Sequence, residues 1–274
     1  VTTMPGSSEK DAIIAKWDDT NNMANYRLYL ENDDADTTGN FGVQIYDESA
    51  SQAITASQAN DQISQNTWYH VAFTFNGGTA GAMGDLKLYV DGKFVGQNST
   101  NGSFLGLEDK ASDFTVGEYD ADDTVATNTA FAGYIDEVKI YSSALTEDQI
   151  KIDMNAGSAI NLGTGQNEAN NLTDGAGNPP VAYYPMDENT GSSYTYDHSG
   201  NGLNMTLVYI DNSDWVPCKF GSCLDFDGTS EYAWYQDTTG SVLDITDAIT
   251  VEAWIKSRAN QGKYTRIVDK SYQT

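Results

Sequence analysis

Apolar and polar residues alternate along most of this chain with a period of two, which is the period of a β-strand. The alternation is clear at residues 26–30, 41–45, 68–75 and 86–90, with turn-rich polar segments between these stretches. Helical periodicity is almost absent. The sequence therefore predicts an all-β fold built from short, half-buried strands.

Two local motifs define individual elements more closely. The segment LYVDGKFVG places Asp91 and Gly92 between two alternating stretches. This predicts a hairpin with a type I′ turn, because both turn residues must accept positive φ. Thr146 is followed three residues later by Gln149, a capping box that predicts a single short helix near 146–154. We expect that helix to close a domain.

A change of composition divides the chain. Residues 156–180 are rich in Gly, Asn and Thr and carry few apolar groups, so burial cannot offset the entropy cost of ordering them. We interpret this segment as a linker that ends in two prolines. Strand-period alternation resumes after it, which divides the chain into 1–155, the linker 156–180 and 181–274.

The chain is strongly acidic, with 40 Asp and Glu against 14 Lys and Arg and a net charge of -26 at pH 7. Such a charge repels nucleic-acid phosphates and anionic lipid head groups. No apolar run approaches the roughly 20 residues that span a bilayer. We therefore expect neither a nucleic-acid partner nor membrane insertion. The carboxylates either form a solubilising surface or, at some positions, converge on calcium.

Several phrases of the sequence resemble the laminin-G-like domain family, a group of concanavalin A-like jelly rolls in secreted bacterial and archaeal proteins. They are VAYYPMDENTG, YDHSGNGLN, KFGSCLDFDG and VEAWIK after residue 180, and WYHVA, LYVDG and IDEVKIY before residue 142. The resemblance covers nearly the whole chain outside the linker. It implies an antiparallel two-sheet jelly-roll sandwich, located outside the cell or on its surface.

The order of these phrases is inverted relative to the family, because its opening phrases follow its closing ones here. A circular permutation or a cut through a tandem array would each explain the inversion. However, KDAIIAKW and KYTRIVDKS read as the same strand, and aligning Lys16 on Lys270 places Ile14 on Val268. A permuted domain would contain that strand once, so the overlap favours a tandem repeat.

On this interpretation, 1–155 is the C-terminal part of one laminin-G-like module and 181–274 is the N-terminal part of the next. Each part alone would have an open sheet edge and an unburied apolar face. The two parts would complete a sandwich with each other, or with neighbouring copies in a head-to-tail assembly.

The resemblance also implies a calcium site in the loop YDHSGNGLN, together with the first acidic residue of IDEV. Side-chain and backbone oxygens suit calcium, and a tight turn brings them together. The alternative is an ordinary Asx turn capped by the loop aspartate. The implied set is Asp197, Gly200, Asn201 and Asp136.

The two cysteines, Cys218 and Cys223, are close in sequence, and we favour a disulfide between them over a reduced pair. Zinc is not expected, because four Cys or His ligands are normally needed and the two histidines lie apart from the pair. In a secreted chain, N-x-S/T triplets accept glycans. The candidate acceptors are Asn98, Asn101, Asn171 and Asn204.

No catalytic constellation is visible. The E-x-D-x-x-E motif of laminarinase-like relatives is absent, and the adjacent Asp136 and Glu137 would face opposite sides of a sheet. His70 lies within an apolar strand, where a buried structural role is expected. Among the aromatic residues, Trp234 and Tyr235 are candidates to face a sugar, with a place in the core as the alternative.

The sequence thus favours a non-catalytic extracellular structural or adhesive module that assembles with copies of itself into a filament, sheath or surface layer. The alternative function is a calcium-dependent carbohydrate-binding, lectin-like module whose partners are glycans.

Overall fold

A computed structural model gives the arrangement of the chain. It describes residues 9–15, 25–32, 38–47, 49, 51–59, 62–77, 84–100, 104, 106–107, 113–117, 131–155, 179–191, 193–238, 240–258 and 268–271. The predicted glycan acceptors Asn101 and Asn171, and residues 156–178 of the predicted linker, lie outside these ranges.

The described residues form short strands and one α-helix, as the period-two alternation predicts. The strands of the first part of the chain are β1 Glu9–Ala15, β2 Tyr26–Asn32, β3 Thr38–Asp47, β4 Gln52–Ser57, β5 Ile63–Ser64, β6 Tyr69–Asn76, β7 Asp85–Val90, β8 Lys93–Ser99, β9 Asp113–Val116 and β10 Ala132–Tyr141. The helix α1 Glu147–Met154 and the strands β11 Ala182–Tyr184, β12 Tyr194–Thr195, β13 Met205–Val208, β14 Trp215–Pro217, β15 Ser222–Asp227, β16 Tyr232–Tyr235, β17 Ala248–Ser257 and β18 Val268–Ser271 follow, with a 3-10 turn at Asn212–Asp214.

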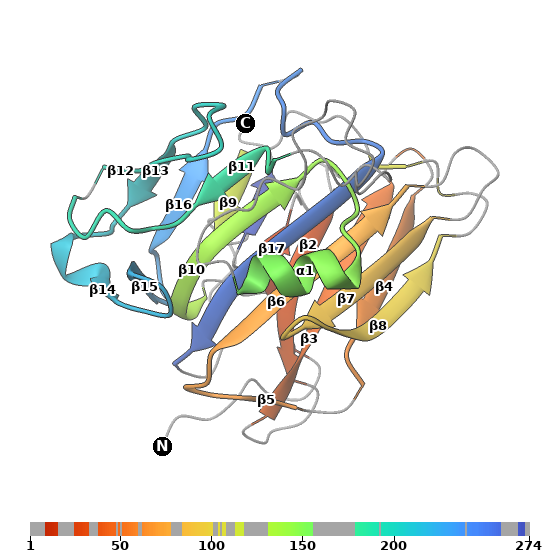
Figure 1. Cartoon of the computed structure of the whole chain (residues 1–274), viewed down its shortest axis with the longest axis horizontal. Helices are drawn as coiled ribbons and strands as arrows, with labels where there is room; N and C mark the ends of the chain where they lie inside the picture. Colours follow the sequence, from red (N-terminus) through yellow and green to blue (C-terminus); the bar gives the residue numbers. More distant parts are fainter. Residues whose placement is uncertain are drawn as a thin grey trace.

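Two sheets pack face to face (Figure 1). Among the described strands, one sheet has the order β12-β13-β16-β9-β18-β1-β2-β3-β4, with β5 added beside β3. The other has the order β14-β15-β10-β17-β6-β7-β8, with β11 added beside β10. Nearly all described pairings are antiparallel, and the architecture confirms the predicted all-β jelly-roll sandwich.

Both sheets combine strands from before and after the predicted linker. In the eight-stranded sheet, β17 lies between β10 and β6 and pairs with both over most of its length. In the other sheet, β16 and β18 flank β9. The segments 1–155 and 181–274 therefore complete one sandwich within this chain.

The main core fills the space between the two sheets. Tyr26 on β2 and Phe73 on β6 meet across it with ring centroids 5.8 Å apart, and Phe114 on β9 stacks on Tyr184 of β11 at 6.3 Å. All four rings are buried. Aromatic pairs of this kind add to the area term of burial, and here they join strands from the two sheets.

The hairpin and the helix follow their local sequence signals. Asp91 and Gly92 connect β7 to β8 with φ of 50° and 69°, so both turn residues have the positive φ of the predicted type I′ turn. At the start of α1, the backbone N–H of Gln149 donates to the Thr146 side chain, and the backbone N–H of Thr146 donates to Gln149 Oε1. The predicted capping box is therefore present.

Helix α1 covers the outer face of the eight-stranded sheet (Figure 1). Beneath it lies a second, smaller apolar cluster, separate from the main core. This cluster is formed by Ala72, Tyr89, Tyr141, Leu145 and Ile150. Within the described part of the chain, no helix is long and apolar enough to cross a membrane.

Candidate functional site

The loop predicted to bind calcium forms an Asx turn. Asp197 Oδ1 accepts hydrogen bonds from the backbone N–H groups of Tyr183 and Ser199, at 3.1 and 2.8 Å. Its Oδ2 accepts from the Ser199 hydroxyl at 2.8 Å and from the Leu203 N–H at 3.1 Å. Both carboxylate oxygens of Asp197 are therefore engaged in shaping the loop, which is the alternative that the sequence left open.

The remaining predicted ligands divide between two hydrogen-bond networks. Asn201 belongs to the loop and donates through Nδ2 to the carbonyl of Val181 at 2.9 Å. Gly200 has a φ of 95° and is exposed at the turn. Asp136 instead lies on β10 and accepts a hydrogen bond from the N–H of Phe220. Among the described residues, no three His, Cys, Asp or Glu side chains form a metal-binding group.

Asp136 has an unusual environment. It is fully buried, its Oδ2 accepts from Phe220 N at 3.0 Å, and its Oδ1 has no hydrogen-bond partner. Burial, reinforced by the nearby negative charges of Glu137 and Asp187, raises the pKa of Asp136 to about 8. A buried carboxylate oxygen without a donor is costly unless a cation or a proton satisfies it.

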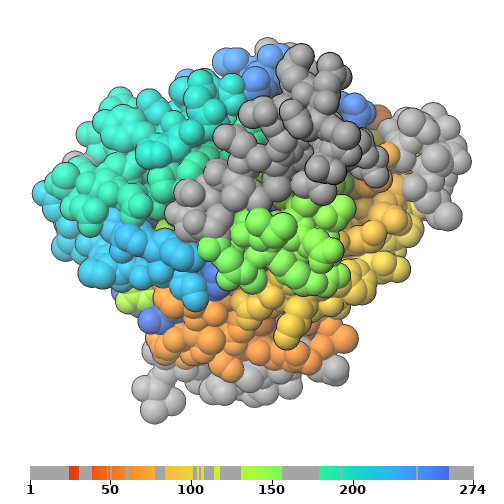
Figure 2. Space-filling view, in the orientation of Figure 1, coloured from red at the N-terminus to blue at the C-terminus, as the bar shows by residue number. Residues whose placement is uncertain are grey.

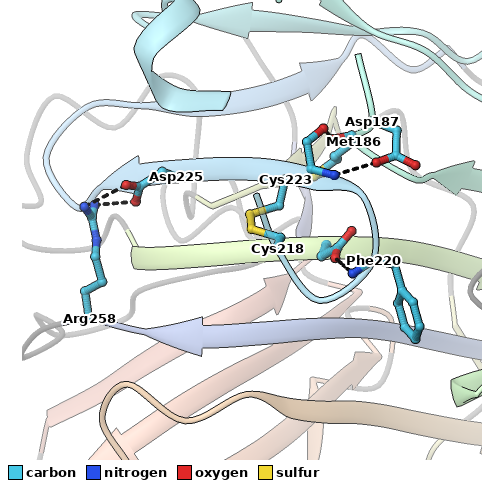
Figure 3. Close-up of a disulfide and its surroundings, with 9 residues drawn as sticks. Met186, Asp187, Cys218, Phe220, Cys223, Asp225 and Arg258 are labelled. Carbon is cyan, nitrogen blue, oxygen red and sulfur yellow. Dashed lines mark hydrogen bonds and ion pairs between the residues drawn. A yellow bond between two sulfur atoms is a disulfide. The ribbon is translucent and has the colours of Figure 1, made fainter. Parts of the chain in front are cut away.

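The disulfide loop 218–223 donates the backbone N–H of Phe220 to this carboxylate. Figure 3 shows the loop with Asp187 on its other side. Cys218 and Cys223 are bonded, as the sequence predicts. Asp187 holds the other side of the loop, because its Oδ1 accepts from Ser222 N at 2.7 Å. A Cβ on Gly221, which has a φ of 53°, would overlap the Asp187 carboxylate. Asp136 and Asp187 thus both receive backbone N–H groups of the disulfide loop.

The Asp136 carboxylate, unlike that of Asp197, keeps one oxygen without a hydrogen-bond donor. Asp136 has a free, buried oxygen, and Asp187 is exposed, so solvent reaches the pair from one side. Carboxylate oxygens are the ligands that calcium prefers. Sequence reasoning missed Asp187, although the phrase YPMDENTG contains it. Asp136 and Asp187 are the described residues beside the disulfide loop that could offer carboxylate oxygens to a cation.

The two predicted sugar-facing aromatic residues lie on β16 and point to opposite faces. Tyr235 is half-buried and packs against the main core, so it does not form a sugar platform. Trp234 lies on the outer face of the sheet and is also half-buried. The alternation along the strand separates them.

Two predicted glycan acceptors lie in the described region, and both are exposed. Asn98 is on the edge strand β8, where its Nδ2 donates to the carbonyl of Thr55 at 2.8 Å. Asn204 follows the Asx-turn loop and accepts from the N–H of Asp197 at 3.1 Å.

A groove on the outer face of the eight-stranded sheet is the clearest concave site among the described residues. It has a volume of about 490 Å³ and lies beside α1, over the strands β6, β7 and β8. Figure 2 shows this face, with the green helix next to the orange and yellow strands. Strand register places its floor side chains in three rows: Thr74 with Lys87 and Gln97, Asn76 with Asp85, and Tyr89 with Phe94.

The third row supplies an aromatic surface. The Phe94 side chain is 45% exposed, although it is large and apolar. The buried ring of Tyr89 holds it edge-on, with centroids 6.1 Å apart. The other two rows offer hydroxyl, amide and charged groups. The floor therefore combines one apolar platform with closely spaced hydrogen-bonding groups.

The charged side chains of the groove have partners. Lys87 Nζ lies 3.8 Å from Asp85 Oδ2, and Ser99 donates to the other Asp85 oxygen at 3.2 Å. On the helical wall, Glu147 pairs with Lys151 at 2.6 Å. The groove thus has no unpaired charge among these residues.

The predicted structural role of His70 agrees with its position. The side chain is buried and contacts the Trp254 ring, with centroids 5.4 Å apart. Its Nε2 lies 3.7 Å from Glu252 Oε2. Burial lowers the pKa of His70 to about 3, with a contribution from Lys139, so the imidazole is neutral.

Comparison with known families agrees with this fold. A laminin G profile of the concanavalin A-like lectin/glucanases superfamily matches residues 3–151. The chain belongs to this superfamily. Searches among curated proteins and among solved structures each gave no match. The superfamily includes lectins and glycosidases, and its laminin G-like members are typically extracellular. Membership supports a carbohydrate-binding or structural module.

Proposed function

We propose that this chain is a non-catalytic, extracellular carbohydrate-binding module, and that it binds its ligand in the groove between α1 and β8. The floor of the groove carries the proposal, because it places the exposed ring of Phe94 beside two rows of polar side chains. A sugar ring presents an apolar face and a rim of hydroxyl groups. An aromatic ring stacks on the apolar face, and amide, hydroxyl and carboxylate groups form hydrogen bonds with the hydroxyl groups.

The charge of the groove favours a neutral glycan. Asp85 and Lys87 form an ion pair within it, so their opposite charges offset each other. The net charge of -26 for the whole chain repels uronic acids and sulfated sugars. A neutral hexose polymer or oligosaccharide therefore matches the site better than an acidic glycan.

The ion pairs of the groove favour binding without cleavage. A glycosidase needs two carboxyl groups on either side of the scissile bond, one acting as an acid and one as a base or nucleophile. Glu147 and Asp85 are instead each engaged with a lysine. A disulfide favours an oxidising compartment, which agrees with a location outside the cell.

The test is isothermal titration calorimetry of the full chain against neutral oligosaccharides, after a glycan array has selected them. We expect Phe94→Ala to weaken binding about three- to tenfold, because an aromatic contact contributes about 0.5–1.5 kcal/mol. Gln97→Ala should weaken it further. Tyr209→Ala is the matched control, since Tyr209 is 77% exposed and is not part of the groove.

The outcomes separate the alternatives. Selective binding of neutral glycans that Phe94→Ala weakens and Tyr209→Ala leaves unchanged supports the proposal. An array with no selective binding, or binding that is equally weakened by both variants, would overturn it. Release of reducing sugar from a bound oligosaccharide would show that the module is catalytic.

A further inference from the structure

One position in the ten-stranded sheet is filled by two strands. Between β9 and β2 lie both β18 and β1, and they run parallel to each other with Ile14 beside Val268 and Ala15 beside Asp269. Among the described strands, this is the only parallel pairing. On the far sides, β18 pairs with β9 and β1 pairs with β2, both antiparallel.

The two neighbouring strands also resemble each other in sequence. The segments IIAK, residues 13–16, and IVDK, residues 267–270, share their first and last residues and align with Ile14 on Val268. The same two residues face each other in the sheet. Two similar segments thus lie side by side, in the same direction and in the register of their alignment.

Because the two strands run in the same direction, each has the orientation needed to pair with either neighbour. β1 pairs with β2 from Glu9 to Ala15, whereas it pairs with β18 only at Ile14 and Ala15. The junction between the duplicates is the shortest ladder along this part of the sheet. Strands of a sheet lie about 4.8 Å apart, so the sheet would have a gap of one strand if β1 left. β18 has the direction needed to pair with β2 across that gap.

We propose that β1 and β18 are interchangeable, and that β1 is exchanged between copies of this chain. In the exchanged form, β1 of one copy lies between β18 and β2 of the next copy. The pairings that β1 makes within its own chain in this structure are then made between two chains. Repetition of this step in one direction builds a head-to-tail chain of modules, since a heterologous contact does not close on itself unless its rotation forms a ring.

The partner is a second copy of this chain because the repeat itself specifies it. The position beside β18 accepts a parallel strand, and the strand that lies there is β1, whose sequence resembles that of β18. This inference is independent of the carbohydrate groove, which is built from β6, β7, β8 and α1.

Cross-linking between two full-length variants tests the exchange. One variant carries Ile14→Cys and the other Val268→Cys, and a short bismaleimide is added after they have been mixed. We expect a covalent heterodimer, because each chain carries only one of the two new cysteines, and these lie side by side only when β1 of one copy pairs with β18 of another. The native disulfide is left intact because no reductant is used.

A matched mixture, Ile14→Cys with Tyr209→Cys, controls for random collision, because Tyr209 is exposed and belongs to neither strand. Equal yields of dimer in the two mixtures would overturn the proposal. So would a wild-type chain that sediments as a single copy at every concentration.

A proline variant gives a second readout. Ile14→Pro removes a backbone donor from β1. We expect the mass of the wild type in analytical ultracentrifugation to rise with concentration and that of Ile14→Pro to remain that of one copy. Glycan affinity per chain should be unchanged in Ile14→Pro, because the groove does not include β1. Loss of assembly with unchanged glycan binding would therefore separate the strand exchange from the function of the groove. Continued assembly of Ile14→Pro would contradict the exchange of β1.

Discussion

Lys139 Nζ lies 3.3 Å from Asp153 Oδ1, in the buried space between β10 and the last turn of α1. The other Asp153 oxygen accepts a hydrogen bond from the Tyr141 hydroxyl at 2.7 Å. Two further carboxylates approach the same ammonium group, Glu137 at 3.7 Å and Glu252 at 4.0 Å. One lysine therefore serves three acidic side chains, and it joins the helix to strands from both parts of the chain.

Replacing this lysine should strongly destabilise the protein. Lys139→Met leaves Asp153 and Glu137 buried without a cation, and breaking a buried pair in this way costs about 3–5 kcal/mol. Urea unfolding followed by tryptophan fluorescence measures the loss. Lys151→Met is the matched control, because Lys151 pairs with Glu147 on the exposed side of the helix, and it should change the unfolding midpoint little. Equal effects of the two variants would contradict the importance of the buried cluster.

Stability should fall in acid through His70. Burial lowers the pKa of His70 to about 3, below the ordinary value of 6.5, so the unfolded chain binds a proton in this range that the folded chain does not. The free energy of unfolding therefore decreases as the pH falls from 6.5 towards 3, by at most about 1.4 kcal/mol per pH unit from this group.

The other histidine provides the control for this prediction. His198 is exposed, so His198→Gln should keep the acid dependence of the wild type, whereas His70→Gln should flatten it. Urea unfolding at several pH values gives the comparison. The prediction fails if the wild type and His70→Gln lose stability in parallel below pH 6.5.

Calcium should act through Asp136. Added calcium is expected to raise the melting temperature of the wild type above pH 8, where Asp136 is ionised, because the cation satisfies the free Oδ1 and offsets the charges of Asp136 and Asp187. Asp136→Asn should abolish this shift. Differential scanning calorimetry with calcium and with a chelator measures it.

Asp197→Asn distinguishes the two places where calcium is expected. Both Asp197 oxygens hold the Asx turn, so this variant should lower the melting temperature while keeping the calcium response. A response that is lost in Asp197→Asn and kept in Asp136→Asn would place the ion in the loop 196–204 instead.

Loss of the disulfide should have a moderate effect. Closing a loop of this length lowers the entropy of the unfolded chain by an amount that corresponds to about 2 kcal/mol. The double variant Cys218→Ser, Cys223→Ser should lose about that much in urea unfolding. Reductant should destabilise the wild type equally and leave the double variant unchanged. An effect of reductant on the double variant would show that another group responds.

Local signals in the sequence predicted local structure well. The Asp91-Gly92 turn and the Thr146 capping box each depend on residues within four positions of each other, and both are present. The disulfide between Cys218 and Cys223 is likewise local. The sandwich was predicted from the period-two alternation and from the resemblance to laminin-G-like domains, because both signals occur in many segments of the chain.

The candidate sites depended on distant contacts, which no local pattern contains. Asp136 meets Phe220 from 84 positions away, so the sequence placed it with Asp197 instead of with the disulfide loop. The groove required the register of β6, β7 and β8, because only that register brings Thr74 beside Lys87 and Gln97. Trp234 and Tyr235 are adjacent in sequence, yet only one of them faces the core.

The position of β17 also determines the order in which the protein can fold during synthesis. This strand lies between β6 and β10, yet it is made long after both. Until residues 248–257 leave the ribosome, β6 and β10 each keep the unpaired edge that β17 fills in the folded protein. Such long-range closure is slow, and the waiting chain is prone to aggregate.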